Sequence, residues 1–227
     1  MDGENGGRES AEEQRRQWLT YYSRKRIIQQ WTQLALLGSV ECRRVLEIGP
    51  ARGLVTAMLV NAGYEVGTLD YCRPAFTNPI VPHIIADLRE VKSQEIAGYD
   101  AILCCETLEH IEWETVGRIL ETLRHSGARY LVISVPYMET QLTFDLYVNA
   151  HVARHYFSLK KLINRRSFTP GPRGEHQWEV GYRGYSLQAW EQRLTNAGWL
   201  IRQRDFTEHC RSVFHILEAS PAGRATG

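Results

Sequence analysis

The sequence predicts an α/β protein with a doubly wound, mostly parallel seven-stranded sheet that carries helices on both faces. Short apolar runs alternate with helix-like segments along most of the 227 residues, which is typical of a buried parallel sheet. A glycine turn follows the first apolar run and an acidic residue ends the second, as at the ligand-binding edge of such sheets. With 43% hydrophobic and 23% charged residues, the chain can form one globular core.

The N-terminal part is predicted to lie outside the sheet. Residues 1–10 are rich in Gly and polar residues, which indicates a disordered tail. From Ser10 to Leu37 there is no Gly or Pro, and aromatic and aliphatic residues recur near helical spacing, so we expect one or two amphipathic helices. The predicted organisation is a tail and helical extension at 1–40, the main domain at 41–219 and a second disordered tail at 220–227.

Strands and helices follow in alternation. The first unit runs from a strand at Val45–Ile48, through a Gly/Pro turn and a helix at Leu54–Asn61, to a second strand that ends at Asp70. Residues 137–185 interrupt the alternation after the fifth strand; they are rich in aromatic residues, His and Arg, and we expect a functional insertion. The remaining strands are predicted at 83–88, 99–105, 128–136, 199–206 and 213–218, and the remaining helices at 113–125 and 187–197.

Charge and cysteine content exclude several classes of function. The 27 Lys and Arg against 26 Asp and Glu leave a net charge of +1, without the basic excess of non-specific nucleic-acid or anionic-membrane binders. No apolar run approaches a membrane span, and the first residues lack the basic start and apolar stretch of a signal peptide, so we expect a cytoplasmic chain without a membrane partner. The five cysteines lack metal-ligand spacing and indicate reduced, structural thiols.

Candidate ligand-binding residues lie at the ends of the first two predicted strands. The first turn reads LEIGPARG, in which Gly49 and Gly53 allow backbone N–H groups to approach a ligand closely. Asp70 ends the second strand about 20 residues later, the spacing at which a carboxylate accepts the hydroxyls of a ribose.

Two further carboxylates have competing interpretations. Glu47 ends the first strand and is assigned to the same site, although it could instead pair with Arg43 or Arg44. Asp87 lies at the end of the third strand, where it could contact an adenine amine or cap a following helix.

These residues resemble the successive motifs of the class I S-adenosylmethionine-dependent methyltransferases. The resemblance rests on VLEIGPARG, Asp70, ADL at 86–88, YDAILCCETLEHI and LVISVPY, and it covers roughly 45–136 and, more loosely, the chain up to 218. It implies a Rossmann-like fold, S-adenosylmethionine as cofactor and S-adenosylhomocysteine as product. The family's turn commonly reads E-x-G-x-G-x-G, and Ala51 replaces the middle glycine here, which is tolerable if its φ is negative.

The resemblance also implies residue roles. Glu47, Gly49 and Gly53 would face the methionine part of the cofactor, Asp70 the ribose, and Asp87 with Leu88 the adenine. A nicotinamide dehydrogenase would share the first unit, but ETLEHI after the fourth strand favours methyl transfer. The full predicted set of cofactor-binding residues is Glu47, Gly49, Pro50, Gly53, Asp70, Tyr71, Asp87, Leu88 and Glu106.

A sulfonium methyl is already electrophilic, so the enzyme mainly aligns an O, N or C nucleophile and removes its proton. We assign the catalytic role to His110, after the fourth strand, and to His176 in the insertion, and expect them to converge on the acceptor. His151 and His155 are weaker candidates. The insertion 137–185 then forms a substrate lid, and its aromatic residues suit a flat or hydrophobic small-molecule acceptor.

Two alternatives stay open. Glu106, Glu109, His110 and His176 resemble the metal site of the small-RNA 3′-terminal 2′-O-methyltransferases, and they suit Mg²⁺ or Mn²⁺. Basic residues in the insertion could follow RNA phosphates, although we favour a metal-free site and interpret the basic run as a solvated or lid-forming helix. The second alternative is a non-catalytic, cofactor-binding partner subunit. The sequence leaves the acceptor and the oligomeric state open.

Overall fold

The structure, a computed structural model, describes residues 11–72, 81–160, 167–170, 175–207 and 211–220. Two helices, α1 (Ala11–Tyr21) and α2 (Arg24–Leu37), precede the first strand, in the stretch for which the sequence predicts one or two helices. The side chain of Ser23 caps α2 by accepting a hydrogen bond from the backbone N–H of Arg26. None of the helices in the described part of the chain combines the length and the apolarity needed to cross a membrane.

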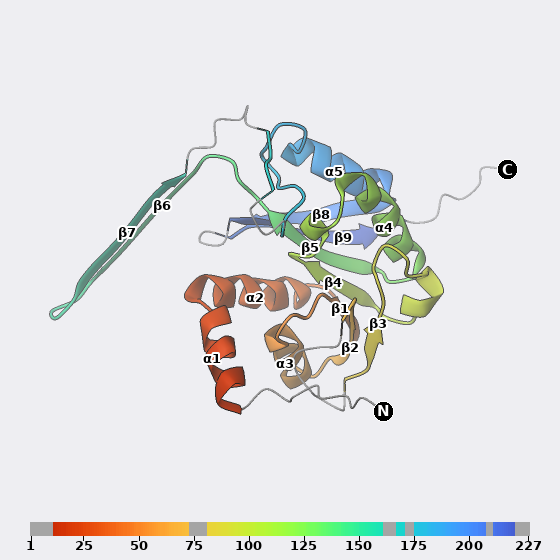
Figure 1. The fold of residues 1–227 in the computed structure, drawn as a ribbon, viewed down its shortest axis with the longest axis horizontal. Helices are drawn as coiled ribbons and strands as arrows, with labels where there is room; N and C mark the ends of the chain where they lie inside the picture. The colour runs from red at the N-terminus through yellow and green to blue at the C-terminus, as the bar shows by residue number, and fades with distance from the viewer. Residues whose placement is uncertain (1–10, 73–80, 161–166, 171–174, 208–210, 221–227) are drawn as a thin grey trace, which may run out of the picture.

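A seven-stranded sheet in the order β3-β2-β1-β4-β5-β9-β8 forms the centre of the molecule (Figure 1). Strand β9 runs antiparallel to both of its neighbours, and the other strands are parallel to one another. The predicted mostly parallel sheet of seven strands is therefore confirmed. Its strands are β1 (Arg44–Ile48), β2 (Glu65–Asp70), β3 (His83–Ile85), β4 (Ala101–Cys105), β5 (Tyr130–Pro136), β8 (Trp199–Phe206) and β9 (Ser212–Ala219).

Helices cover both faces of the sheet and create two apolar interfaces (Figure 1). Helices α4 (Trp113–His125) and α5 (Leu187–Asn196) pack on one face, together with the short helix η1 (Ser93–Ile96). Helix α3 (Leu54–Asn61) and the C-terminal part of α2 pack on the other face. Cys104 and Cys105 point to opposite faces of β4, and both are buried free thiols because neither face is open to water.

The insertion contains an element that the sequence analysis did not predict. Strands β6 (Gln141–Val148) and β7 (Ala153–Lys160) form a two-stranded antiparallel ribbon that extends away from the sheet (Figure 1). The expected helix in the basic run is therefore wrong for residues 153–160. Apolar and polar residues alternate with a period of two in β6, which favours a strand over a helix. Residues 161–166 and 171–174, with most of the basic run, lie outside the described residues, as do 1–10 and 221–227 of the predicted tails.

The end of the insertion returns to the sheet and is bonded to it. The backbone N–H of Gln177 donates to the carbonyl of Glu109 at 2.7 Å, and that of Val180 donates to Pro136 at 3.0 Å. Trp178 is fully buried, and its indole N–H donates to the carbonyl of Ile111 at 2.9 Å. Residues 175–180 are thus held against the segment that follows β4.

Candidate functional site

A cleft of about 640 Å³ lies at the carboxyl ends of β1, β2 and β4. The strand order reverses between β1 and β4, and doubly wound sheets bind ligands at such a point. Of the predicted cofactor residues, Glu47, Pro50 and Gly53 do not line the cleft. The predicted residues that do line it are Gly49, Asp70, Tyr71, Asp87, Leu88 and Glu106, and they are joined there by the predicted base His110 and by Tyr21, Thr107 and Glu175.

The glycine turn after β1 brings the backbone close to the cleft. Gly49 has φ +73°, and its N–H donates to the carbonyl of Leu69 at 2.9 Å. A Cβ at this position would lie 2.6 Å from the hydroxyl of Thr107, so the turn accepts only glycine there. Gly53 also has a positive φ, +76°, and is the N-cap of α3.

Ala51 departs from its expected conformation. Its φ is +48° rather than negative, so the condition that would make alanine harmless at this position is not met. The turn uses left-handed backbone at 49, 51 and 53, the three glycine positions of the family pattern. A left-handed conformation costs an L-residue about 1–2 kcal/mol, and this chain therefore carries strain at the wall of the cleft.

Glu47 lies beneath the turn, with 4% of its surface exposed. It accepts a hydrogen bond of 2.5 Å from the hydroxyl of Thr56, and burial raises its pKa to about 7. The alternative pairing with Arg43 or Arg44 is wrong, since both arginines pair with Glu65 instead. A direct contact of Glu47 with a cofactor stays a prediction.

The two acidic residues beyond β2 and β3 differ in their surroundings. Asp70 ends β2 at the rim of the cleft, and one carboxylate oxygen lies 3.4 Å from the backbone nitrogen of Cys72. Asp87 pairs with Arg89 at 2.6 Å, and the hydrogen bond from Arg89 lowers the pKa of this carboxyl. A turn follows Asp87, and the next helix, η1, has Lys92 as its N-cap, so the alternative role of Asp87 as a helix cap is wrong.

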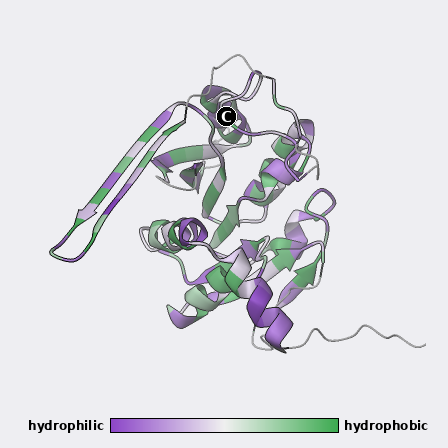
Figure 2. Cartoon of the chain, turned by 60° about the vertical axis from the view of Figure 1, so that its left-hand side comes forward, coloured by the Kyte–Doolittle hydropathy of each residue, from purple (hydrophilic) through white to green (hydrophobic). Residues whose placement is uncertain are grey.

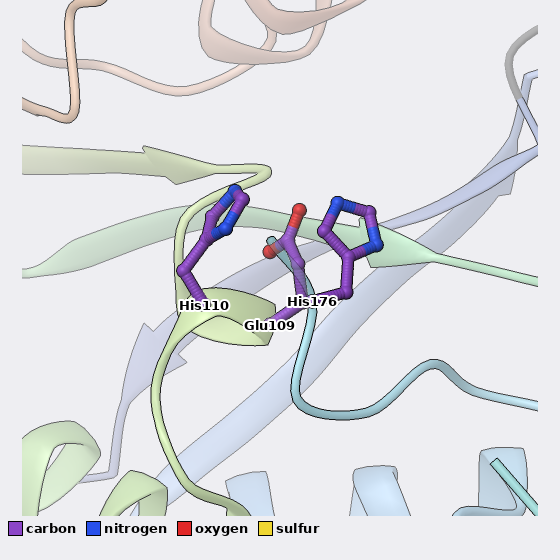
Figure 3. A group of neighbouring side chains, drawn as sticks. All are labelled: Glu109, His110 and His176. Carbon is purple, nitrogen blue, oxygen red and sulfur yellow. The ribbon is translucent and has the colours of Figure 1, made fainter. Parts of the chain in front are cut away.

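Three side chains from two distant segments meet beside the cleft (Figure 3). Glu109 and His110 belong to the short helix η2 (Leu108–His110), and His176 lies on the returning end of the insertion. One ligand atom of each residue lies within 4.8 Å of the others, and the carboxylate of Glu109 lies between the two imidazoles. The structure thus brings His110 and His176 together, with ring centroids 5.0 Å apart.

Hydrogen bonds orient both imidazoles in the same way. Nδ1 of His110 donates to the carbonyl of Glu175, and Nδ1 of His176 donates to the carboxylate of Glu179 at 2.8 Å. Each neutral ring therefore keeps its lone pair on Nε2, the atom that can accept a proton or bind a metal. Burial lowers the pKa of His110, whereas the hydrogen bond to Glu179 raises the pKa of His176.

Two buried carboxyl groups, Glu109 in this cluster and Glu106 beside it, differ in the hydrogen bonds that they accept. Glu109 is fully buried, neither of its oxygens reaches a hydrogen-bond donor on another described residue, and burial raises its pKa well above the usual range. Glu106 accepts a hydrogen bond from Ser134 at 2.9 Å, and burial raises its pKa to about 7. Glu106 is not one of the three residues that share the 4.8 Å group, but its charge raises the pKa of His176. A buried carboxyl group without hydrogen-bond donors, such as that of Glu109, is either protonated or paired with a cation.

Sequence reasoning missed several residues around the site. Gln29 of α2 donates to Ser212 at 3.3 Å and stabilises the charged form of Glu106. The buried glutamines at 29, 30 and 33 repeat at helical spacing, a pattern that the sequence already contained. Thr107 carried no signal, because its place on the cleft wall depends on chain segments far away in the sequence. His151 and His155 lie on the ribbon, outside the cluster.

Comparison with known proteins gives the fold of the chain. Its sequence matches no protein-family model and no curated protein sequence. Solved structures do match it, among them a 1,6-didemethyltoxoflavin N1-methyltransferase from Burkholderia thailandensis, bound to 1,6-didemethyltoxoflavin and S-adenosylhomocysteine. That match has a TM-score of 0.57 and 16% identity, and it covers 91% of this chain and 82% of the other.

Two further solved structures share this fold. The methyltransferase domain of bacterial CtHen1-C matches with a TM-score of 0.60 and 14% identity, over 87% of this chain and 100% of that domain. The N-methyltransferase NodS from Bradyrhizobium japonicum, in complex with S-adenosylhomocysteine, matches with a TM-score of 0.58 and 13% identity, over 90% of this chain and 92% of the other. The chain therefore has the fold of the class I S-adenosylmethionine-dependent methyltransferases.

Proposed function

We propose that the protein is an S-adenosylmethionine-dependent methyltransferase that methylates an O, N or C nucleophile of a small-molecule acceptor. The observation that carries the proposal is the position of the left-handed Gly49 turn and the Asp70 carboxylate in one cleft, at the point where the strand order reverses. Structural neighbours solved with S-adenosylhomocysteine support this choice of cofactor.

The cleft residues suit the parts of this cofactor. Asp70 accepts hydrogen bonds from the ribose hydroxyls, and the close approach allowed by Gly49 admits the methionine end. Leu88 offers an apolar contact to adenine. Asp87 must share its carboxylate between the adenine amine and Arg89, because its ion pair with Arg89 is already formed.

His110 and His176 supply the proton acceptor. When bound, the cofactor offers an electrophilic methyl group, and transfer breaks its bond to sulfur as the bond to the acceptor atom forms. The proton of the acceptor passes to Nε2 of His110, which its lowered pKa keeps neutral and receptive near pH 7. His176, whose Nδ1 is hydrogen-bonded to Glu179, shares the removal of this proton through its own Nε2.

A second candidate function is metal-assisted 2′-O-methylation at the 3′ end of RNA. The meeting of Glu109, His110 and His176 favours it, because one nitrogen of each imidazole and one oxygen of the unpaired carboxyl lie within 4.8 Å of one another, a donor set suited to a divalent cation. Such a cation would hold the terminal ribose hydroxyls and lower the pKa of the attacking one. Glu106 would add a further negative charge nearby.

One experiment separates these functions. The protein is incubated with methyl-labelled S-adenosylmethionine and either metabolite fractions or short RNAs, each with and without a chelator. Chelator-resistant labelling of a small molecule supports the first function, and chelator-sensitive labelling of RNA supports the second. A protein that labels neither acceptor by itself, and supports labelling only when a partner protein is added, would instead be a partner subunit, and both proposals would fail.

We assign this activity to the cytoplasm. The described cysteines Cys42, Cys72, Cys104 and Cys105 are free thiols, and Cys72 is exposed. Exposed thiols persist in reducing compartments, whereas oxidising compartments convert them to disulfides.

A further inference from the structure

The β6–β7 ribbon has two chemically different faces. The register pairs Leu142 with Leu159, Phe144 with Phe157, Leu146 with His155 and Val148 with Ala153. Directly paired residues of an antiparallel ribbon lie on the same face, so these four pairs form one apolar face. The alternate pairs, such as Thr143 with Ser158 and Asp145 with Tyr156, form a polar face.

The apolar ribbon face, defined by these four pairs, is open to water. Its large apolar residues keep between 46% (Leu159) and 67% (Leu142) of their surface exposed. On the polar face, Gln141, Thr143 and Asp145 are instead half-buried. The ribbon extends away from the sheet, and hydrophobic residues recur along its length (Figures 1 and 2).

Such a surface is typical of an interaction site. A two-stranded ribbon by itself is only marginally stable in water, and contiguous apolar patches of several hundred Å² are rare on monomers except at interaction sites. The exposed fractions of the six large apolar residues correspond to roughly 600 Å² for one chain, and two such faces would bury about 1,200 Å² together, the lower limit of stable protein interfaces.

Charge and shape identify the partner. The apolar ribbon face contains no Lys, Arg, Asp or Glu, and the charged Asp145 and Arg154 lie on the opposite face. It therefore lacks the basic residues through which proteins bind anionic membranes. The same pleated row of side chains on a second copy has matching length and polarity, and pleated apolar faces of this kind stack about 10 Å apart in β-sandwiches.

We propose that the apolar ribbon face is the interface between two copies of this chain, which stack face to face about a two-fold axis. The proposal does not depend on methyl transfer. It does bear on the site, because the ribbon and the segment that carries His176 belong to the same insertion between β5 and α5. Dimerisation would hold the ribbon and thereby restrain this insertion.

The test compares matched double variants by sedimentation velocity, over a roughly hundredfold range of concentration. Phe144→Thr/Phe157→Thr removes the aromatic pair from the apolar face, and threonine retains a high strand propensity. Tyr147→Thr/Tyr156→Thr makes the same kind of change on the polar face. Wild type and the tyrosine variant should form dimers, and the phenylalanine variant should raise the dimer dissociation constant by more than about tenfold.

Wild type that stays monomeric throughout overturns the proposal, as does equal dissociation of both variants. Monomeric wild type that floats with phosphatidylserine vesicles would identify a membrane as the occupant and would also overturn it. Thermal melting checks that the phenylalanine variant is folded. If it is not, Leu142→Thr/Val148→Thr at the two ends of the same face replaces it, with the same expected dissociation.

Discussion

The imidazole rings of His110 and His176 lie 5.0 Å apart at an interplanar angle of 82°, although one follows β4 and the other ends the insertion. Both rings donate through Nδ1, one to the carbonyl of Glu175 and the other to the carboxylate of Glu179. Two Nε2 atoms are therefore presented beside the cleft and the buried carboxyl of Glu109. This arrangement is the chemical centre of both proposed functions.

His176→Ala should lower kcat by roughly 10²–10⁴-fold, the contribution expected of a general base, with little change in affinity for S-adenosylhomocysteine. Loss of the metal in the second function would give a similar loss of rate. His151→Ala, on the exposed turn of the ribbon, is the control and should keep the wild-type rate. A folded His176→Ala protein with full kcat at saturating acceptor would remove this residue from the chemistry.

Asp70→Ala should abolish most of the thermal stabilisation by S-adenosylhomocysteine. Hydrogen bonds to a charged group contribute about 1.5–3 kcal/mol each, so affinity should fall at least about tenfold. Asp205→Ala, on the exposed part of β8, removes a carboxylate outside the cleft and should leave the stabilisation intact. An undiminished shift in the Asp70 variant would refute the ribose assignment.

Ala51→Gly should keep the free energy of unfolding or raise it by up to about 1 kcal/mol, because glycine relieves the left-handed strain but adds entropy to the unfolded chain. Ala57→Gly is the matched control: Ala57 is an exposed residue inside α3, and glycine there should cost about 1 kcal/mol. Urea denaturation measures both variants. Equal losses in the two would show that Ala51 is not strained.

Glu47→Gln should alter the dependence of stability on pH. The folded chain holds the proton of Glu47 up to about pH 7, while the unfolded chain releases it near 4.5. Between these values the unfolded state binds fewer protons, so this group makes the free energy of unfolding fall as pH rises, by an amount on the order of 3 kcal/mol. Glutamine stays neutral and should remove this part of the slope.

Thr56→Val provides the complementary measurement. The hydrogen bond from Thr56 stabilises the charged form of Glu47 and lowers its pKa. Its loss should extend the decline in stability to higher pH. The free energy of unfolding is measured from denaturation curves at pH 5 and at pH 8. If it changes between these two pH values by the same amount in wild type and in Glu47→Gln, the burial argument is contradicted.

The order and type of the main elements were determined by the sequence alone. The apolar periods predicted the helices at 54–61 and 113–125 with the bounds found in the structure, and the strands of the sheet within a few residues. These elements can be predicted because the spacing of apolar residues within each one matches the face that it buries in the sheet or against it. The glycine turn and Asp70 were equally readable, since the carboxyl ends of neighbouring parallel strands always meet at one edge.

Tertiary structure decided what depends on long-range contacts. The left-handed φ of Ala51 follows from closing the turn between β1 and α3, and a residue type does not report it. His176 meets Glu109 and His110 because Gln177 bonds to Glu109 and Trp178 to Ile111, contacts between segments that are remote in the sequence. The ribbon was not predicted, because neither of its faces packs into the core of the chain. Apolar and polar residues do alternate in its sequence, but strands outside a core are hard to distinguish from a surface loop on that pattern alone.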